Sequence, residues 1–258
     1  MTARVKDHIT QCLRQLHLPA FAANYEQVAT VAATEGWTYD NYLLQLCRLE
    51  LDEREQRKIQ RLLNASKLPR EKTLNTFDRA RLKKPVDKHF SALLDGDFLD
   101  RHENVLIFGN PGSGKTHLLC ALGHELIHKR RSVYFAECVL LVQRLLRAKL
   151  ELRLERELKK LDKYEALIID DIGYVQQSRE EMEVLFTLLA HRYEHRSVLI
   201  TSNLVFSQWE KIFKDPMTTA AAVDRLVHHS VILELNLSSY RMETAQQKKK
   251  DVLSLEVG

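Results

Sequence analysis

The chain has 258 residues, which is enough for one sizeable hydrophobic core and a smaller unit. Hydrophobic residues make up 45% and charged residues 29%, a balance that excludes a disordered chain. No apolar run approaches the roughly 20 residues needed to span a bilayer, and residues 1–18 lack the apolar stretch of a signal peptide. The four cysteines are far apart and form no Cys-x-x-Cys pair, so neither a disulfide framework nor a zinc site is expected, and the chain is predicted to be cytoplasmic.

Positive charge is concentrated in one part of the chain. The formal net charge is only +4, but residues 48–88 carry 13 Lys and Arg against seven Asp and Glu, a local excess of +6. Such an excess attracts polyanions such as nucleic acid or an anionic membrane, unless it is simply a well-solvated helical surface.

The N-terminal quarter of the sequence shows helical patterning only. Within residues 39–68, leucine and isoleucine recur at spacings of three, four and seven, as the apolar stripe of a helix requires. Breaks at Leu18-Pro19 and Gly36-Trp37 divide the region into several helices.

A linker is expected after these helices. Residues 67–90 contain two prolines and show little periodicity. We therefore predict a helical N-terminal domain over residues 1–68, a linker over 69–100 and a second domain over 101–258.

The second domain has the sequence pattern of an α/β protein. Four short apolar runs are separated by helix-like segments, and a fifth closes the set. The runs are residues 104–108, 132–136, 166–170, 197–201 and 231–235. Strands that alternate with helices predict a mostly parallel sheet with helices on both faces. Such sheets bind ligands at the carboxyl ends of their strands, where a glycine cluster follows the first run.

The glycine cluster completes the P-loop pattern Gly-x-x-x-x-Gly-Lys-Thr. Glycines let backbone N–H groups converge on phosphate oxygens, and the following helix aims its positive end at them. Lys115 is expected to reach the β- and γ-phosphates, and the Thr116 hydroxyl to ligate Mg²⁺. A Rossmann interpretation fails because His117 stands where a third glycine or alanine belongs. The predicted nucleotide-binding residues here are Gly109, Asn110, Pro111, Gly112, Ser113, Gly114, Lys115, Thr116 and His117.

Two later strand ends carry polar side chains. The run that ends in Asp170-Asp171 is typical of a Walker-B strand, with a plain strand-to-turn junction as the alternative. Asp170 would hold Mg²⁺ through its water shell, and Asp171 would polarise the attacking water. Asn203 lies just beyond the next run and would bridge that water and the γ-phosphate, unless it only forms a turn. ATP and Mg²⁺ are therefore the expected ligands.

With these elements in order, residues 100–241 resemble the AAA+ ATPases, specifically their initiator and helicase-loader branch. Most similar is the IstB family, the helper ATPases of insertion-sequence transposons. The segments "RQLHLPAFAANYE", "ASKLPREKTLNTFD" and "GNPGSGKTHLLCALGHELI" all resemble that family, so the resemblance covers most of the chain. It implies a P-loop AAA+ core with a parallel five-stranded sheet, preceded by a small all-helical domain.

The resemblance also implies roles for single residues. Asn203 matches the sensor-1 position. Arg225 looks like the arginine finger that such ATPases insert into a neighbour's active site, with a surface or interhelical arginine as the alternative. Arg241 resembles the C-terminal sensor arginine. Phe77 matches a position that packs on adenine, with a buried linker aromatic as the alternative.

The sequence departs from the family pattern in two places. The usual Walker-B pair is Asp-Glu, whereas Asp171 is one methylene shorter, which implies slow hydrolysis. The chain ends about 17 residues after Arg241, too few for the helical lid of many AAA+ proteins. We therefore expect no C-terminal lid.

Residues 140–164, between the second and third strands, predict an unusually long helix. The resemblance implies that an element here faces the DNA-binding channel of the assembly, where phosphate contacts give affinity without sequence specificity. The alternative is a solvated amphipathic helix that pairs its basic residues with Glu151 and Glu155. At helical spacing, Lys149, Arg153, Arg156 and Lys160 form a basic stripe, and Leu150, Leu154, Leu158 and Leu161 form an apolar one.

Together these features predict an ATPase that assembles with ATP on duplex DNA and assists the transposase of its element in selecting target sites. The expected partners are duplex DNA, the transposase and further copies of the chain, with no membrane. The alternatives are a DnaC-like helicase loader, which binds single-stranded DNA, and a nucleotide-gated interaction module without productive hydrolysis.

Overall fold

The computed structural model describes residues 3–173, 178–213 and 215–240. It divides the chain into two compact units, residues 1–61 and 62–258, which are described separately. Within the described residues, no helix is long and apolar enough to cross a bilayer.

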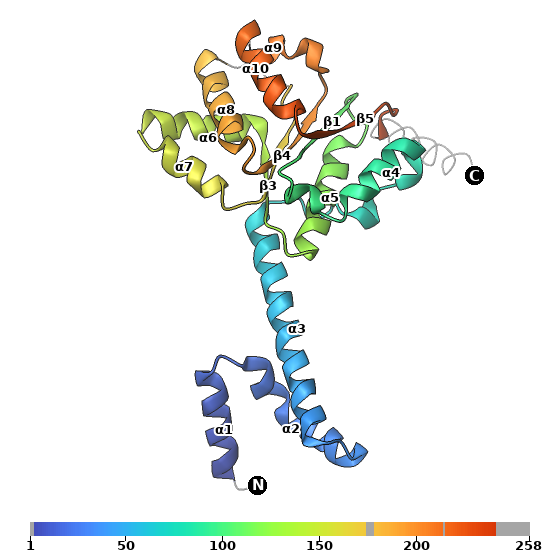
Figure 1. Cartoon of the computed structure of the whole chain (residues 1–258), viewed down its shortest axis with the longest axis vertical. Coiled ribbons are helices and arrows are strands. Elements are labelled where there is room, and N and C mark those ends of the chain that lie inside the picture. The colour runs from blue at the N-terminus through green and yellow to red at the C-terminus, as the bar shows by residue number, and fades with distance from the viewer. Residues whose placement is uncertain (1–2, 174–177, 214, 241–258) are drawn as a thin grey trace, which may run out of the picture. The chain divides into compact units, whose positions relative to one another are not determined.

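Helices alone build the first unit, which contains α1 (Ala3–Gln15), α2 (Pro19–Glu35) and most of α3 (Tyr39–Ser66) (Figure 1). Both predicted breaks are confirmed. Pro19 stands at the start of α2, where its missing N–H costs no hydrogen bond. Gly36 ends α2 in the left-handed conformation, and its N–H donates to the carbonyl of Ala32.

The second unit opens with the end of α3, followed by short helices. These are η1 (Leu74–Thr76), η2 (Arg79–Arg81), α4 (Lys84–Leu93) and η3 (Asp97–Leu99). Sequence periodicity gave no sign of α4. This helix begins at a proline-containing first turn and buries Phe90 and Leu93 against the body of the unit. Residues 62–100 are therefore part of the same compact unit as the sheet.

The sheet confirms the predicted fold class. Its strands are β1 (Asn104–Gly109), β2 (Val133–Glu137), β3 (Ala166–Asp170), β4 (Ser197–Ser202) and β5 (Ser230–Leu235). They lie in the order β2-β3-β4-β1-β5, and every neighbouring pair is parallel. The carboxyl ends of β1, β3 and β4 therefore meet at one edge of the sheet, where the P-loop begins.

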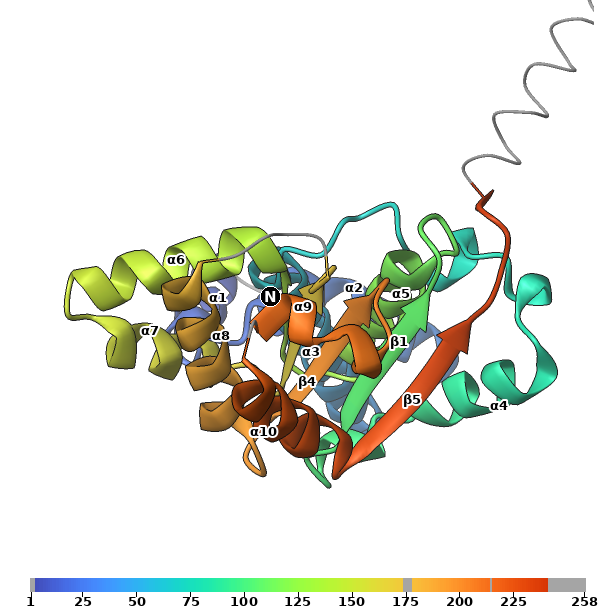
Figure 2. The ribbon, with the colours of Figure 1, turned by 90° about the horizontal axis from the view of Figure 1, so that it is seen from above.

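Helices cover both faces of this sheet (Figure 2). The helices that follow the strands are α5 (Lys115–His128), α6 (Cys138–Leu150), α7 (Leu154–Leu161), α8 (Arg179–Arg192), η4 (Phe206–Gln208), α9 (Glu210–Phe213) and α10 (Pro216–Val227). Because successive strand side chains point to opposite faces, Leu106 and Phe108 join the core beneath α6, α8 and α10. Ile168 points to the other face, where it lies close to Gly123 of α5.

The predicted long helix between β2 and β3 is wrong, because the chain turns back after Leu150 and begins α7 at Leu154. The N–H of Arg153 donates to the carbonyl of Ala148, and that of Leu152 to Lys149, which is the hydrogen-bond pattern of a Schellman helix end. The turn leaves Leu150 77% exposed, so this residue does not belong to a buried apolar stripe as predicted.

The expectation of no C-terminal lid concerns residues 241–258, which lie outside the described residues. Arg241, the predicted C-terminal sensor, belongs to this segment.

Candidate nucleotide-binding site

The P-loop joins β1 to α5, and its backbone lies very close to other parts of the chain. A Cβ atom added to Gly109 would lie 2.3 Å from the carbonyl oxygen of Leu235 in β5. At Gly112, where φ is 79°, an added Cβ would lie 2.2 Å from the Ser239 hydroxyl. These two positions therefore need glycine for steric reasons.

The Lys115 ammonium lies inside this loop, with its side chain largely buried. Its Nζ atom donates hydrogen bonds of 2.8 Å to the carbonyl of Gly109 and 3.0 Å to that of Asn110. The buried Ser113 hydroxyl has no hydrogen-bond partner among the described residues. A buried cation and an unpaired hydroxyl beside a helix N-terminus fit the phosphate oxygens of a nucleotide.

Thr116, in the first turn of α5, meets Asp170 at the carboxyl end of β3. The Thr116 hydroxyl donates to Asp170 Oδ1 at 2.8 Å, and the hydroxyl of Thr201 donates to the same oxygen at 2.6 Å. Hydroxyl and carboxylate oxygens are ligands that Mg²⁺ prefers, so this pair fits the predicted ion. Thr201 was missed by the sequence analysis, although a hydroxyl at the end of the neighbouring strand was a usable signal.

Asp171 and Asn203 lie on adjacent turns. Asp171 has a φ of 62°, and its N–H donates to the Thr201 hydroxyl at 2.8 Å. The side-chain oxygen of Asn203 is buried without a partner in the described structure, and it would lie 2.3 Å from a Cβ atom added to Gly173. The structure therefore places the Asn203 amide against the turn that follows β3.

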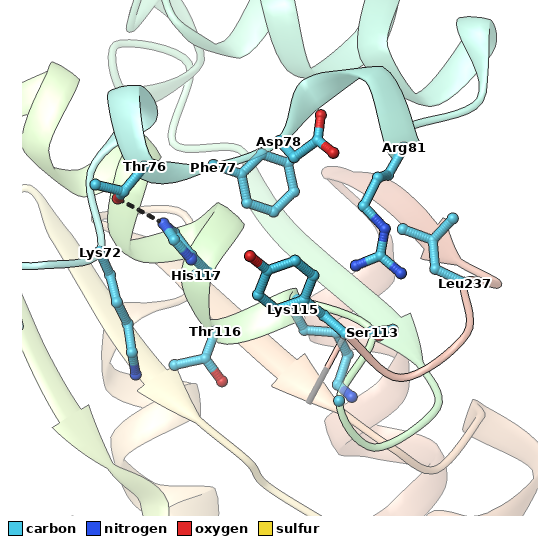
Figure 3. Close-up of a pocket in the computed structure, with 13 residues that line it drawn as sticks. Lys72, Thr76, Phe77, Asp78, Arg81, Ser113, Lys115, Thr116, His117 and Leu237 are labelled. Atoms are coloured by element: carbon cyan, nitrogen blue, oxygen red, sulfur yellow. Dashed lines mark hydrogen bonds between the residues drawn. The ribbon is translucent and has the colours of Figure 1, made fainter. Parts of the chain in front are cut away.

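A pocket opens beside the P-loop, and its opposite wall comes from the segment around η1 and η2 (Figure 3). Phe77 lies edge-on to the His117 ring with centroids 5.2 Å apart, and close to Gly114. The His117 Nε2 atom lies 3.0 Å from the Thr76 hydroxyl and 3.1 Å from the Thr73 carbonyl. Burial lowers the pKa of His117. Lining residues that the sequence analysis missed are Lys72, Thr76, Asp78, Arg81, Leu237 and Tyr240.

Arg81 connects this wall to the segment after β5. Its guanidinium donates to the carbonyl of Ser238 at 3.1 Å and lies 5.1 Å from the centre of the Tyr240 ring. The N–H of Tyr240 donates to the Gly112 carbonyl at 3.1 Å. The strand end, the linker and the P-loop thus share one pocket, which no local sequence pattern could reveal.

Arg225, the predicted arginine finger, does not line this pocket. It lies on α10, 4.9 Å from the centre of the Phe186 ring of α8, and is half-buried. Its guanidinium makes a long hydrogen bond of 3.4 Å to the Ala221 carbonyl.

The predicted DNA-binding residues divide between two places. Lys149 pairs with Glu183 of α8 at 2.8 Å, whereas the other three line a groove between α6 and α7. This basic groove is formed by Arg144, Arg147, Ala148, Glu151, Arg153, Arg156, Glu157 and Lys160. Arg153 pairs with Glu151, and Lys160 with Glu157 at 2.8 Å. Arg147 and Arg156 have no carboxylate partner among the described residues, so the groove keeps a positive charge.

Comparison with known proteins shows which family the sequence matches. Residues 11–249 match the family model of the IstB-like ATP binding proteins. An insertion sequence ATP-binding protein of Sinorhizobium fredii is 42% identical over 92% of this chain and 80% of its own length. The ATP-binding protein of insertion sequence IS5376 from Geobacillus stearothermophilus is 38% identical over 96% of this chain and its whole length.

Solved structures support the fold alone. The DnaC helicase loader has a TM-score of 0.55 at 20% identity, covering 68% of this chain and 99% of that one. AMPPCP-bound DnaA from Aquifex aeolicus has a TM-score of 0.57 at 16% identity, covering 72% of this chain and 57% of that one.

Proposed function

Because the chain belongs to the family of IstB-like ATP-binding proteins, we propose that it is a Mg²⁺-dependent ATPase that assembles on duplex DNA. In the cytoplasm it assists the transposase of its own insertion sequence in selecting target sites. The observation that carries this proposal is the contact between the P-loop and the end of β3. Lys115 lies inside the loop, and the Thr116 hydroxyl donates a hydrogen bond to Asp170.

The residues of the chain divide the work of hydrolysis between them. Lys115 exchanges its two carbonyl partners for the β- and γ-phosphates, which are stronger, charged acceptors. Asp171 polarises the attacking water, and the Asn203 amide holds that water against the γ-phosphate. Thr116 and Asp170 would hold Mg²⁺, which would neutralise part of the phosphate charge. The short Asp171 carboxylate makes turnover slow.

Assembly supplies the remaining charge. Arg225 lies outside its own pocket and serves the site of a neighbouring copy, where an arginine accelerates hydrolysis by about 10³ to 10⁵. Phe77 packs against the adenine ring. Arg241 acts as the C-terminal sensor.

The basic groove supplies the contact to DNA. The guanidinium groups of Arg147 and Arg156 are suited to phosphate oxygens, because they present several donors and have no carboxylate partner in the described structure. Phosphate contacts of this kind place the protein on any duplex and leave the choice of sequence to the transposase.

One experiment separates the proposed function from its competitors. The ATPase rate is measured with no DNA, with single-stranded DNA and with duplex DNA, and Lys115→Ala serves as the inactive control. We expect the largest rate with duplex DNA. Stimulation by single strands alone would favour a helicase loader, to which the DnaC-like fold also corresponds. Equal rates under all three conditions would contradict the proposal.

Two substitutions on α7 test the groove. Arg156→Glu should weaken duplex binding at every sequence and lower the slope of log affinity against log salt concentration by about 1. Lys159→Glu is the matched control, because Lys159 is exposed, pairs with Glu155 and does not line the groove. Fluorescence anisotropy at several salt concentrations measures both. Equal effects of the two substitutions would argue against a specific role for the groove.

A further inference from the structure

Three metal-binding side chains meet at the edge of the sheet opposite to the P-loop. Glu194 lies in the turn between α8 and β4, and His228 and His229 lie between α10 and β5. These turns precede their strands, whereas the P-loop follows β1, and parallel strands place the two at opposite edges. Within the described residues, this is the only group of three or more such side chains whose ligand atoms all lie within 4.8 Å of one another.

A buried asparagine fixes the two turns relative to each other. The Asn104 side chain accepts a 2.8 Å hydrogen bond from the N–H of Val198 in β4 and donates at 3.2 Å to the carbonyl of Leu226 in α10. Its backbone N–H donates to the carbonyl of His229 at 2.7 Å. The backbone on both sides of the cluster is therefore held by one residue of β1.

The turn that carries Glu194 is also fixed by a buried arginine beside it. Arg192, two residues earlier, is fully buried, and its guanidinium donates to the carbonyls of Leu161, Tyr164, Glu165 and Ser197 at 3.0 to 3.3 Å. Glu194 itself has a φ of 59°, which directs the chain sharply out of the helix. By contrast, the three side chains of the cluster are exposed, and the Nδ1 atom of His228 lies 3.4 Å from the Tyr193 hydroxyl.

We propose that Glu194, His228 and His229 bind one transition-metal dication of the Zn²⁺ type. Two imidazoles and one carboxylate form a donor set suited to zinc and its neighbours, and they leave one position for water. Ligand atoms about 2.1 Å from a tetrahedral ion lie about 3.4 Å apart, so small rotations of exposed side chains complete the site. The cysteine spacing in the sequence gave no sign of it, because the donors are histidines from one segment and a glutamate from another.

Such an ion would connect the turn after α8 to the end of α10, one helical turn beyond Arg225. An ion that binds only the folded chain raises its melting temperature. The site is independent of nucleotide binding and of the function proposed above.

Zinc binding to the full chain tests the proposal directly. Zn²⁺ is titrated against a chromophoric chelator with Mg²⁺ in excess, so that the carboxylate and hydroxyl groups beside the P-loop are saturated. We expect one high-affinity Zn²⁺ per chain and a rise in melting temperature. His228→Gln and Glu194→Gln should each weaken binding at least tenfold and remove the thermal shift.

The matched control is His195→Gln, which changes an exposed histidine beside Glu194 that is not part of the cluster. It should leave both zinc affinity and thermal shift unchanged. Melting in the presence of EDTA shows that each variant folds. The proposal is overturned if folded wild-type protein binds no stoichiometric Zn²⁺, or if His195→Gln weakens binding as much as His228→Gln.

Discussion

His117 joins the first turn of α5 to the wall of the nucleotide pocket. Its ring lies within hydrogen-bond distance of the Thr73 carbonyl and stands edge-on to Phe77. Because the carbonyl can only accept, Nε2 carries a proton and donates to it, and the ring needs no second proton. Enclosure of the ring lowers the pKa of His117, chiefly through loss of solvation, and the nearby positive charge of Lys72 also contributes.

This lowered pKa predicts a pH-dependent contribution to stability. Between the folded-state pKa of His117 and its ordinary value of about 6.5, the unfolded chain binds more protons, so the free energy of unfolding rises with pH. The contribution is complete above about pH 6.5 and decreases as the pH falls below it. His117→Asn should therefore reduce the loss of stability between pH 7.5 and pH 5.

Urea denaturation at both pH values measures this difference. The control is His128→Asn, which changes an exposed histidine at the other end of the same helix. If His117→Asn loses as much stability on acidification as the wild type, the buried ring does not contribute in this way.

For single residues, the sequence predicts those site residues that belong to one short motif. The P-loop and Asp170 are found because their order along the chain is the motif. Arg81 and Tyr240 could not be found in this way, because their hydrogen-bond partners, the carbonyls of Ser238 and Gly112, lie far away in the sequence. Their contacts depend on the tertiary fold, which periodicity does not specify.

Among the elements, the hairpin of α6 and α7 shows the limit of periodicity. Leucines and basic residues continue at helical spacing through residues 149–161, and nothing in that spacing marks an end. The chain nevertheless turns at Leu152, which has a φ of 54° without being glycine. The turn lets Leu158 and Leu161 join the core beside α8. Burial of these leucines contributes more than continuation of one helix.

The strained turn predicts that Leu152→Gly stabilises the protein. Leu152 is 95% exposed, so its side chain contributes little burial, while its left-handed backbone costs about 1 kcal/mol that glycine does not incur. We expect the free energy of unfolding to rise by about 1 kcal/mol. Gln143→Gly, at an exposed position in the middle of α6, should lower it by about 1 kcal/mol.

Urea denaturation of the two variants checks this contrast, with unchanged helical circular dichroism as evidence of an unchanged fold. A destabilised Leu152→Gly variant would mean that the turn is not strained, or that the leucine is covered in the assembled protein.

The strands were easier to predict than the helices that precede them. The central strands β1, β3 and β4 are buried along almost their whole length because both faces of the sheet are covered there, and their apolar runs are visible in sequence. Helix α4 was missed because it is short and its first turn contains a proline. Its stability comes from packing of Phe90 and Leu93, which are buried by residues distant in sequence.

In the whole molecule, the residues that we propose for ATP hydrolysis do not all line one pocket. Lys115, Thr116 and Asp170 are assembled at the carboxyl edge of the sheet, but Arg225 lies on α10 and does not line the pocket. If Arg225 serves a neighbour, nucleotide binding and hydrolysis become separable. Each subunit can then bind ATP by itself, whereas hydrolysis requires the assembly.

This separation predicts the behaviour of mixed assemblies. Arg225→Ala should bind ATP normally, because its own pocket is complete, yet hydrolyse it at least 10²-fold more slowly when assembled. Lys115→Ala should not bind ATP, because the phosphates lose their main cation, but it retains an intact Arg225. A mixture of the two inactive proteins should recover part of the ATPase rate, since some Arg225→Ala sites then receive an arginine from a Lys115→Ala neighbour.

The ATPase rate of the mixture is compared with that of each variant alone, after co-assembly has been shown by affinity capture of one tagged variant. A mixture that remains inactive despite co-assembly would place Arg225 in its own subunit, where its contact with Phe186 would make it a residue that positions α10 against α8. Recovery requires an arginine supplied by a second chain, because neither variant alone contains both a working pocket and a working finger.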